Sequence, residues 1–319
     1  MSDIRLPLGD WAAAFIDVVT ALLGGFFAVV RDIFAGFYDA IEFVLQAPPF
    51  WIVIIGLAAI AWLAKGWKLA VGTAIGLLVI VGVDQWENAM ATLALVLVAS
   101  LVAVVVSVPV GILAARSDVA SKVIRPILDF MQTMPAMVYL IPALILFRVG
   151  VVPGIVATII FSMAPGVRLT ELGIRGVDKE VVEAGHAFGS SPWRILRQIQ
   201  LPLAMPSIMA GVNQVIMLSL SMVVIAGMVG AGGLGGDVVQ SLTRIDVGLG
   251  FEAGLSVVIL AIILDRVTGA LGARKPRGRR SSTDAAGKPD DASKATDLSE
   301  TDGSGLPIKH SILKSPIDA

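Results

Sequence analysis

The stretch Asp178–Pro202 reads DKEVVEAGHAFGSSPWRILRQIQLP and predicts two short helices joined by a tight turn. Asp178 can accept hydrogen bonds from the first-turn amides of one helix, and Gly189 can adopt the positive φ that ends it. Ser191 can begin a second helix with Pro192 at its first position, where no amide donor is needed. The pattern therefore predicts an amphipathic helix–turn–helix plate, although this spacing alone also fits an ordinary amphipathic loop.

Long apolar stretches surround this plate. The chain of 319 residues is 56% hydrophobic and 15% charged, whereas soluble domains have about 25% charged residues. A helix needs about 20 apolar residues to cross the hydrocarbon core, and lipid offers no partners for non-helical backbone. We predict an all-α membrane protein with about seven transmembrane helices, at Trp51–Ala64, Leu69–Val83, Ala89–Ala115, Met137–Phe147, Pro153–Val167, Ser207–Val229 and Gly250–Leu271.

Basic residues predict the orientation of these spans, because Lys and Arg are concentrated in cytoplasmic loops. If the plate is cytoplasmic, alternation places Lys65–Lys68, Arg116–Phe130 and everything after Leu271 on the same, strongly basic side. The loops on the other side contain only Arg148 and Arg244. We therefore predict a multi-pass protein of the cell (plasma or inner) membrane with an external N-terminus and a cytoplasmic C-terminus. A miscounted span would break this alternation.

The segments before and after the spans differ in character. Residues 1–48 predict an external helix in the membrane interface, because their polar residues share one stripe about 100° wide. The alternative is an eighth span at Trp11–Val30, but Asp17 inside it would cost about 2.5–3.5 kcal/mol. Residues 273–319 predict a cytoplasmic tail, with the basic run Lys275–Arg280 near anionic lipids and a polar, disordered remainder. The transmembrane domain is then 49–272, with its cytoplasmic loop at 172–202.

The sequence lacks the common motifs of catalytic and metal-binding sites. It contains no phosphate-binding loop, serine elbow or zinc-protease motif, no cysteine, and only the histidines His186 and His310. The net charge of −1 does not predict nucleic-acid binding. We therefore expect that the chain is not an enzyme and holds no metal or cofactor, and that a partner or an ion gradient powers any active transport.

The plate resembles the cytoplasmic signature of binding-protein-dependent ABC importer permeases. That signature reads Glu-Ala-Ala, three residues, Gly, nine residues, Ile, one residue and Leu-Pro. Gly185 stands here where the second alanine is usual. The resemblance implies a type I ABC importer permease fold, in which this loop inserts into a groove of an ATP-hydrolysing subunit. The expected coupling residues are Glu183, Ala184, Gly185, His186, Gly189, Ser190, Ile199, Leu201 and Pro202.

A finer resemblance covers about Asn88–Thr268. The segments Gln132–Pro142, Leu201–Gln214, Ser219–Ala226 and Leu260–Arg266 look like those of glycine betaine/proline (quaternary amine) importer permeases. This resemblance implies alternating access through a permease homodimer. Two copies of an ATP-binding subunit would hold Mg-ATP, and an extracytoplasmic substrate-binding protein would deliver a small zwitterionic osmoprotectant. The C-terminal tail departs from the family pattern.

Polar residues on or beside the apolar spans are candidates for the translocation path. They are Gln132, Thr133, Tyr139, Asn213, Gln214, Ser219 and Ser221. For any one of them, hydrogen bonding between helices is the favoured alternative. The i, i+3 spacing of Arg168 and Glu171 allows them to pair, although a capping or snorkelling role is favoured. Met134–Pro135 and Ile141–Pro142 predict an irregular fourth span, and the glycine-rich stretch 227–236 predicts a turn between packed elements in preference to a flexible gate.

The residues alone are compatible with other functions. The near alternative is an ABC permease for another small solute, such as an amino acid or a choline-like cation. A stand-alone secondary transporter would need ionisable residues deep in its spans, and the predicted spans contain almost none. A membrane-embedded enzyme would need a catalytic cluster, which the sequence does not provide.

Overall fold

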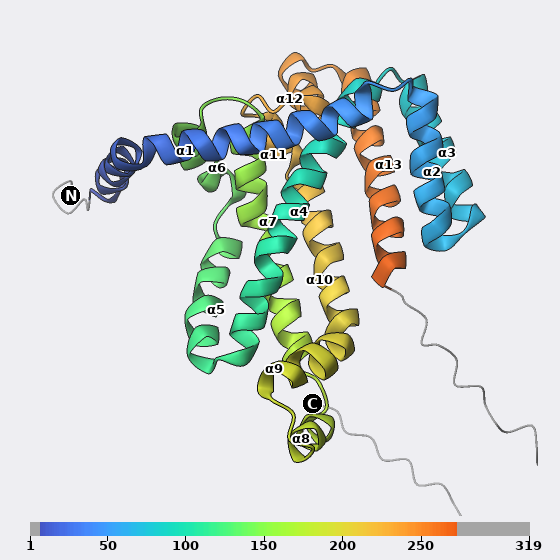
Figure 1. The fold of residues 1–319 in the computed structure, drawn as a ribbon. Helices are drawn as coiled ribbons and strands as arrows, with labels where there is room; N and C mark the ends of the chain where they lie inside the picture. The colour runs from blue at the N-terminus through green and yellow to red at the C-terminus, as the bar shows by residue number, and fades with distance from the viewer. Residues whose placement is uncertain (1–6, 273–319) are drawn as a thin grey trace, which may run out of the picture. The chain divides into compact units, whose positions relative to one another are not determined.

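A computed structural model of the chain describes residues 7–272, which contain helices and connecting turns and no strand. The predicted tail at 273–319 lies outside the described residues. The helices are α1 (Leu8–Gln46), α2 (Phe50–Lys65), α3 (Trp67–Gly82), α4 (Trp86–Arg116), α5 (Asp118–Thr133), α6 (Ala136–Phe147), α7 (Val151–Arg175), α8 (Lys179–Ala187), α9 (Pro192–Ile195), the π-helical turn η1 (Leu196–Gln200), α10 (Leu201–Ser221), α11 (Val223–Gly227), α12 (Gly233–Arg244) and α13 (Val247–Gly272) (Figure 1).

Five helical segments are long and apolar enough to cross a membrane: α1, α4, α7, the run Pro192–Gly227 and α13. Helices α5 and α6 make a sixth if the pair, bent by 97°, is one span, and α2 and α3 are shorter apolar helices. When α1 is set aside, these elements correspond one by one to the seven predicted spans. The all-α fold class predicted from the sequence is therefore confirmed.

The fourth predicted span needs correction. The stretch Arg116–Phe130, predicted as a loop, forms most of α5, which begins where the Ser117 hydroxyl accepts a hydrogen bond from the Ala120 amide at 3.2 Å. The bend between α5 and α6 falls at Met134–Pro135, as predicted, because proline forces the residue before it into an extended conformation. Pro142 lies inside α6 without ending it, so the second predicted break is wrong.

Two other boundaries differ from the prediction. Helix α7 continues past Val167 to Arg175, and the sixth span is continuous with the second helix of the plate, from Pro192 to Gly227. The glycine-rich stretch contains the predicted turn at residues 228–232, but α12 begins directly after it at Gly233. Sequence analysis missed α12 because its glycine-rich start resembles a loop.

Helix α7 packs closely between α4 and α10. A Cβ atom on Gly166 would lie 2.4 Å from the Ser107 Oγ on α4 and 3.0 Å from the Val215 Cγ2 on α10. Near the α8 end of α7, a Cβ on Gly173 would lie 2.7 Å from the Cβ of Ser207. Small residues let helix backbones approach closely in a membrane, where the hydrophobic effect does not drive helices together. These glycines therefore set the spacing of the central three helices.

Helix α1 runs across the ends of α4 and α7 at the end of the bundle opposite α8 (Figure 1). Its inner face is held by buried Tyr38 and Leu45 and by an edge-to-face contact of Phe27 with Phe147 at 5.5 Å. A helix transverse to α4 and α7 cannot cross the bilayer that they cross, which supports the interfacial interpretation. Its large exposed apolar residues recur at helical spacing and form one lipid-facing stripe: Trp11, Phe15, Val18, Leu22, Phe26, Val29, Ile33 and Phe37.

Replacing Gly166 by valine should disrupt the central packing. The added side chain would overlap Ser107 and contact Val215, and overpacking of this kind costs about 1–3 kcal/mol. We expect a lower melting temperature and less monodisperse protein after detergent extraction. Gly72→Val is the matched control, because a Cβ at Gly72 meets nothing within 4 Å. Equal behaviour of the two variants would contradict the packing account.

Candidate functional site

The residues 178–202 form a compact projection, which we call the foot. The Asp178 carboxylate accepts a hydrogen bond from the Glu180 amide at 3.0 Å, and the Ser191 hydroxyl accepts one from the Arg194 amide at 3.4 Å. Gly189 has a φ of 72° in the turn after α8. The predicted caps and turn are therefore confirmed, but the second helix is short: α9 continues through η1 directly into α10.

Buried residues fix the foot to the bundle. Ile195 and Leu196 are 2% and 1% exposed, and Leu196 packs in a cluster with Ile174 of α7 and with Ala204 and Ile208 of α10. Gly185 of α8 lies against the next turn of the foot. Its Cβ, if present, would be 3.0 Å from the Ile199 Cδ1 and 3.3 Å from the Ile195 Cγ1. Any displacement of the foot must therefore act on α7 and α10.

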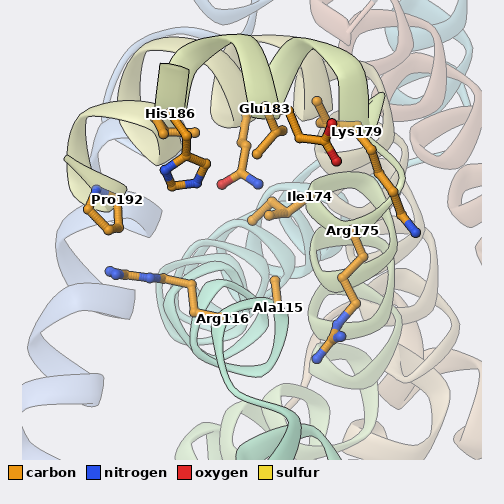
Figure 2. A pocket seen from close by; sticks show the side chains of 12 residues that line it. Ala115, Arg116, Ile174, Arg175, Lys179, Glu183, His186 and Pro192 are labelled. Carbon is orange, nitrogen blue, oxygen red and sulfur yellow. The ribbon is translucent and has the colours of Figure 1, made fainter. Parts of the chain in front are cut away.

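A hollow of about 480 Å³ separates α8 from the ends of α4 and α7. Figure 2 shows Glu183 and His186 of α8 on one side of it and Arg116 and Ile174 on the other. Helical spacing places Val181, Ala184 and Phe188 on the opposite side of α8, and Phe188 is 90% exposed. Trp193, at the start of α9, is 59% exposed. The foot thus has an inner polar face and an outer apolar face.

The structure divides the predicted coupling residues into groups. Gly185 is buried, and Ser190 is bound through its amide to the Gly185 carbonyl oxygen at 3.1 Å. Glu183 and His186 line the hollow, whereas Ala184 lies on the outer face with Val181 and Phe188, which the sequence analysis had not singled out. The remaining residues shape the foot, either at its turn or where η1 joins α10: Gly189, Ile199, Leu201 and Pro202.

Next to the foot, Glu171 of α7 binds α5 through charged hydrogen bonds. This carboxylate is 4% exposed, accepts hydrogen bonds from Ser121 at 2.7 Å and from Arg125 at 2.9 Å, and forms an ion pair with Arg175 at 3.1 Å. Arg175 also pairs with Asp118 at 2.8 Å. A buried carboxylate requires such partners, because its desolvation is otherwise costly. We call these residues the Glu171 cluster.

Arg168 and Glu171 do not pair with each other, although their spacing allows it. Arg168 instead forms an ion pair with Asp129 of α5. The sequence does not predict either ion-pair site, because the partner residues belong to α5, a helix that its charged residues make resemble a loop. Three charged residues and one polar residue are spaced at three and four positions, and this amphipathic pattern was the available signal: Lys122, Arg125, Asp129 and Gln132.

The predicted path residues do not form one site. Gln132 and Thr133 end α5, Tyr139 is on α6, and the other four are on α10. Asn213 alone among them bonds between two spans, since it donates to Asp265 at 3.1 Å and accepts from Thr268 at 2.6 Å. Gln132 and Gln214 are exposed. The remaining four donate hydrogen bonds to carbonyl oxygens of their own or the adjoining helix: Thr133, Tyr139, Ser219 and Ser221.

Metal chemistry has no evident site in the part of the chain that the structure describes. Residues 7–272 contain no group of three or more His, Cys, Asp or Glu side chains that could hold an ion. Near the foot, Glu171 and Asp118 are instead paired with the basic residues Arg125 and Arg175. This arrangement suits mechanical attachment between helices.

Comparisons with known proteins agree with this architecture. Residues 107–276 match the family model described as binding-protein-dependent transport system inner membrane component. The chain is 49% identical to the glycine betaine/carnitine transport permease protein GbuB of Listeria monocytogenes, over 83% of this chain and 95% of that protein. It is 47% identical to the glycine betaine transport system permease protein OpuAB of Bacillus subtilis, over 83% and 94%.

Two further comparisons extend this result. The glycine betaine/proline betaine transport system permease protein ProW of Escherichia coli is 48% identical, over 86% of this chain and 78% of that protein. Among solved structures, an inward-facing conformation of the MetNI methionine ABC transporter has a TM-score of 0.54 and 22% identity, over 59% of this chain and 94% of that chain. This structural likeness supports the fold alone.

Gly189→Val should loosen the foot. Positive φ is costly for a β-branched residue, by about 1–3 kcal/mol, whereas a Cβ at Gly189 meets nothing within 4 Å. The effect is therefore one of backbone conformation. We expect faster amide hydrogen exchange across residues 178–200 in Gly189→Val. Gly189→Asn should stay close to the parent protein, because asparagine tolerates this conformation. Unchanged exchange in the valine variant would contradict the assigned turn.

Glu171→Gln should weaken the attachment of α5. The substitution removes the negative charge from Arg125 and Arg175, and lost hydrogen bonds to charged groups cost about 1.5–3 kcal/mol. Because Arg125 is 60% exposed and can rehydrate, the lower end of this range is expected. The measurement is the melting temperature in detergent. Asp118→Asn, which changes an exposed acid, should have a smaller effect; the reverse order would contradict the central role of Glu171.

Proposed function

Because the chain belongs to the family of binding-protein-dependent transport system inner membrane components, we propose that it is the permease subunit of an ATP-driven importer for a small zwitterionic osmoprotectant of the glycine betaine type. The observation that carries this proposal is the capped foot, packed onto α7 and α10, in a chain nearly half identical to permeases named for glycine betaine. As a permease, the chain translocates a solute and is not itself an enzyme.

The outer face of the foot is the proposed docking surface for an ATP-binding subunit. Val181, Phe188 and Trp193 are exposed apolar side chains on a projection that is not part of a span. Exposed apolar groups gathered on one face are typical of an interaction site. Each chain has one such foot, so a permease homodimer would engage two ATP-binding subunits, which hold the Mg-ATP.

The distribution of basic residues favours a cytoplasmic foot. The end of the bundle that bears the foot includes Lys65, Lys68, Arg116, Arg175 and Lys179, whereas the opposite loops contain only Arg148 and Arg244. This bias is the one that cytoplasmic loops show. The N-terminal helix would then lie on the external surface, where an extracytoplasmic substrate-binding protein delivers the solute, and the C-terminus would be cytoplasmic.

Alternating access follows from how the foot is attached. ATP binding would draw the two feet together, and the Leu196 contacts would transmit this motion to α7 and α10. The Glu171 cluster would transmit it to α5. ATP must bind one state of the permease assembly more tightly than the other to drive the change. Hydrolysis would restore the first state.

The solute is proposed from chemistry and from the relatives together. The relatives reported above are named for glycine betaine, carnitine or proline betaine, which combine a carboxylate with a quaternary ammonium group. Such a zwitterion cannot cross hydrocarbon unaided, because its desolvation is too costly. The alternative solutes are an amino acid or a choline-like cation, which uptake measurements would distinguish.

The test reconstitutes the chain with its ATP-binding subunit and its substrate-binding protein in liposomes. We expect betaine uptake that requires internal Mg-ATP and the binding protein. Phe188→Asp should abolish association with the ATP-binding subunit and uptake, because it places a charge on the apolar docking face. Phe188→Leu is the matched control and should retain both. Uptake by the chain alone, indifferent to ATP, would overturn the proposal in favour of a stand-alone transporter.

A further inference from the structure

Asp129 of α5 and Arg168 of α7 form an ion pair that differs from the nearby Glu171 cluster in exposure. The Glu171 carboxylate is 4% exposed and has three partner residues. The Asp129 and Arg168 side chains are 65% and 41% exposed, and among residues 7–272 the structure records no other partner for either. The Glu171 carboxylate is thus buried among its partners, whereas the Asp129–Arg168 pair is accessible from outside the bundle.

The pair borders a hollow of about 300 Å³ between α5 and α7. Its lining is Arg125, Asp129, Arg168, Glu171, Leu172 and Arg175. Arg168 lies seven residues inside the end of α7, which corresponds to about 10 Å along the helix. The hollow therefore extends about two helical turns from the foot end of α7 along the α5–α7 contact.

This face of α5 cannot lie against lipid. Charge in hydrocarbon is strongly disfavoured, and the short aspartate side chain cannot carry its carboxylate far along the helix as a long Lys or Arg side chain can. Helix α5 has a separate apolar stripe for that environment, made of exposed Val119, Val123, Ile127 and Phe130. On the helical wheel this stripe lies about 130° from the polar stripe that contains Lys122, Asp129 and Gln132. The polar stripe must face water or protein, as the wall of a translocation path does.

We propose that Asp129 and Arg168 form a zwitterion subsite on the path, in which the solute replaces their ion pair. The solute's carboxylate binds the Arg168 guanidinium, and its quaternary ammonium group lies against the Asp129 carboxylate. Both protein charges keep an opposite partner throughout, so neither is left unpaired. Binding is therefore a near-balanced exchange and stays weak, which lets the solute leave.

This inference rests on the proposed function, because it takes the solute to be a zwitterion with a quaternary ammonium group. It adds that the permease itself, and not only the binding protein, selects for both charges. A cation without a carboxylate would leave Arg168 unpaired when it binds Asp129. A carboxylate without a cationic group would leave Asp129 unpaired. Both should therefore bind less well than the zwitterion.

The test uses the absence of cysteine from the chain. In a Gln132→Cys variant of the assembled transporter, the single thiol lies one turn from Asp129 and reports occupancy through its rate of maleimide labelling. We expect glycine betaine to slow labelling by a factor of 1 + [betaine]/Kd, about ten-fold at ten times Kd. Choline, which lacks the carboxylate, should protect several-fold less at the same concentration. Equal protection by choline, or a thiol that no reagent reaches, would overturn the subsite.

A second variant separates binding from structure. Asp129→Asn combined with Arg168→Gln in the Gln132→Cys background removes both charges and leaves a polar side chain at each position. We expect this variant to retain its melting temperature, because both side chains are exposed, but to lose betaine protection and to transport betaine more slowly. Asp118→Asn, which removes an acid elsewhere on α5, is the control and should keep protection. Retained protection in the neutral pair would refute the subsite, whereas ATP-independent uptake by the parent would refute the proposed function.

Discussion

Gly166 of α7 lies so close to Ser107 of α4 and Val215 of α10 that a larger residue would not fit without displacing its neighbours. The hydrophobic effect does not favour helix association inside lipid, so contact must come from complementary surfaces. Gly173 makes the same kind of contact lower on α7, against Ser207. Close packing at two levels fixes the direction of α7 relative to α10, and the foot that joins these helices takes its position from both.

The foot is rigid because its residues form helix caps, a tight turn and buried contacts. The side chains of Asp178 and Ser191 cap first-turn amides of its two helices, and Gly189 adopts the positive φ of the turn between them. Leu196 sits in the π-helical turn through which α9 continues into α10, and it is buried against α7. π-Helical turns are rare and are found mostly at functional sites. Here the turn places the end of the foot and the start of a span on one continuous helical run.

Sequence analysis recovered the features that local chemistry determines. The caps and the turn of the foot depend on residues within a few positions, and the break at Met134–Pro135 depends on one proline. The spans were recovered because their apolar runs are long. Helix α5 was missed because its exposed charged stripe shortens every apolar run, although its spacing is helical. Its partners on α7, about 40 to 50 positions away, are set by tertiary packing that no local pattern encodes.

Tertiary packing also places the candidate coupling residues on different faces of the foot. The motif Glu183–His186 predicted one functional surface, but a helix places consecutive residues on different faces. Gly185 is buried against Ile195 and Ile199, Glu183 faces the hollow, and only Ala184 faces outward. The outer surface is completed by Val181 and Phe188, which the motif does not specify. A signature that identifies the foot therefore describes mostly how the foot is built.

Helix α7 connects the foot with the proposed solute subsite over a short distance. Arg168, Glu171 and Arg175 follow one another at three and four positions, so they share one face of the helix. Arg168 and Glu171 bind α5 at different levels, and Arg175 lies three residues before Asp178, which begins α8 of the foot. A movement of the foot therefore changes the position of the same helix that holds Arg168. If solute binding at Arg168 favours one position of α7, linkage requires that this position of the foot in turn favours the solute, with the same coupling free energy.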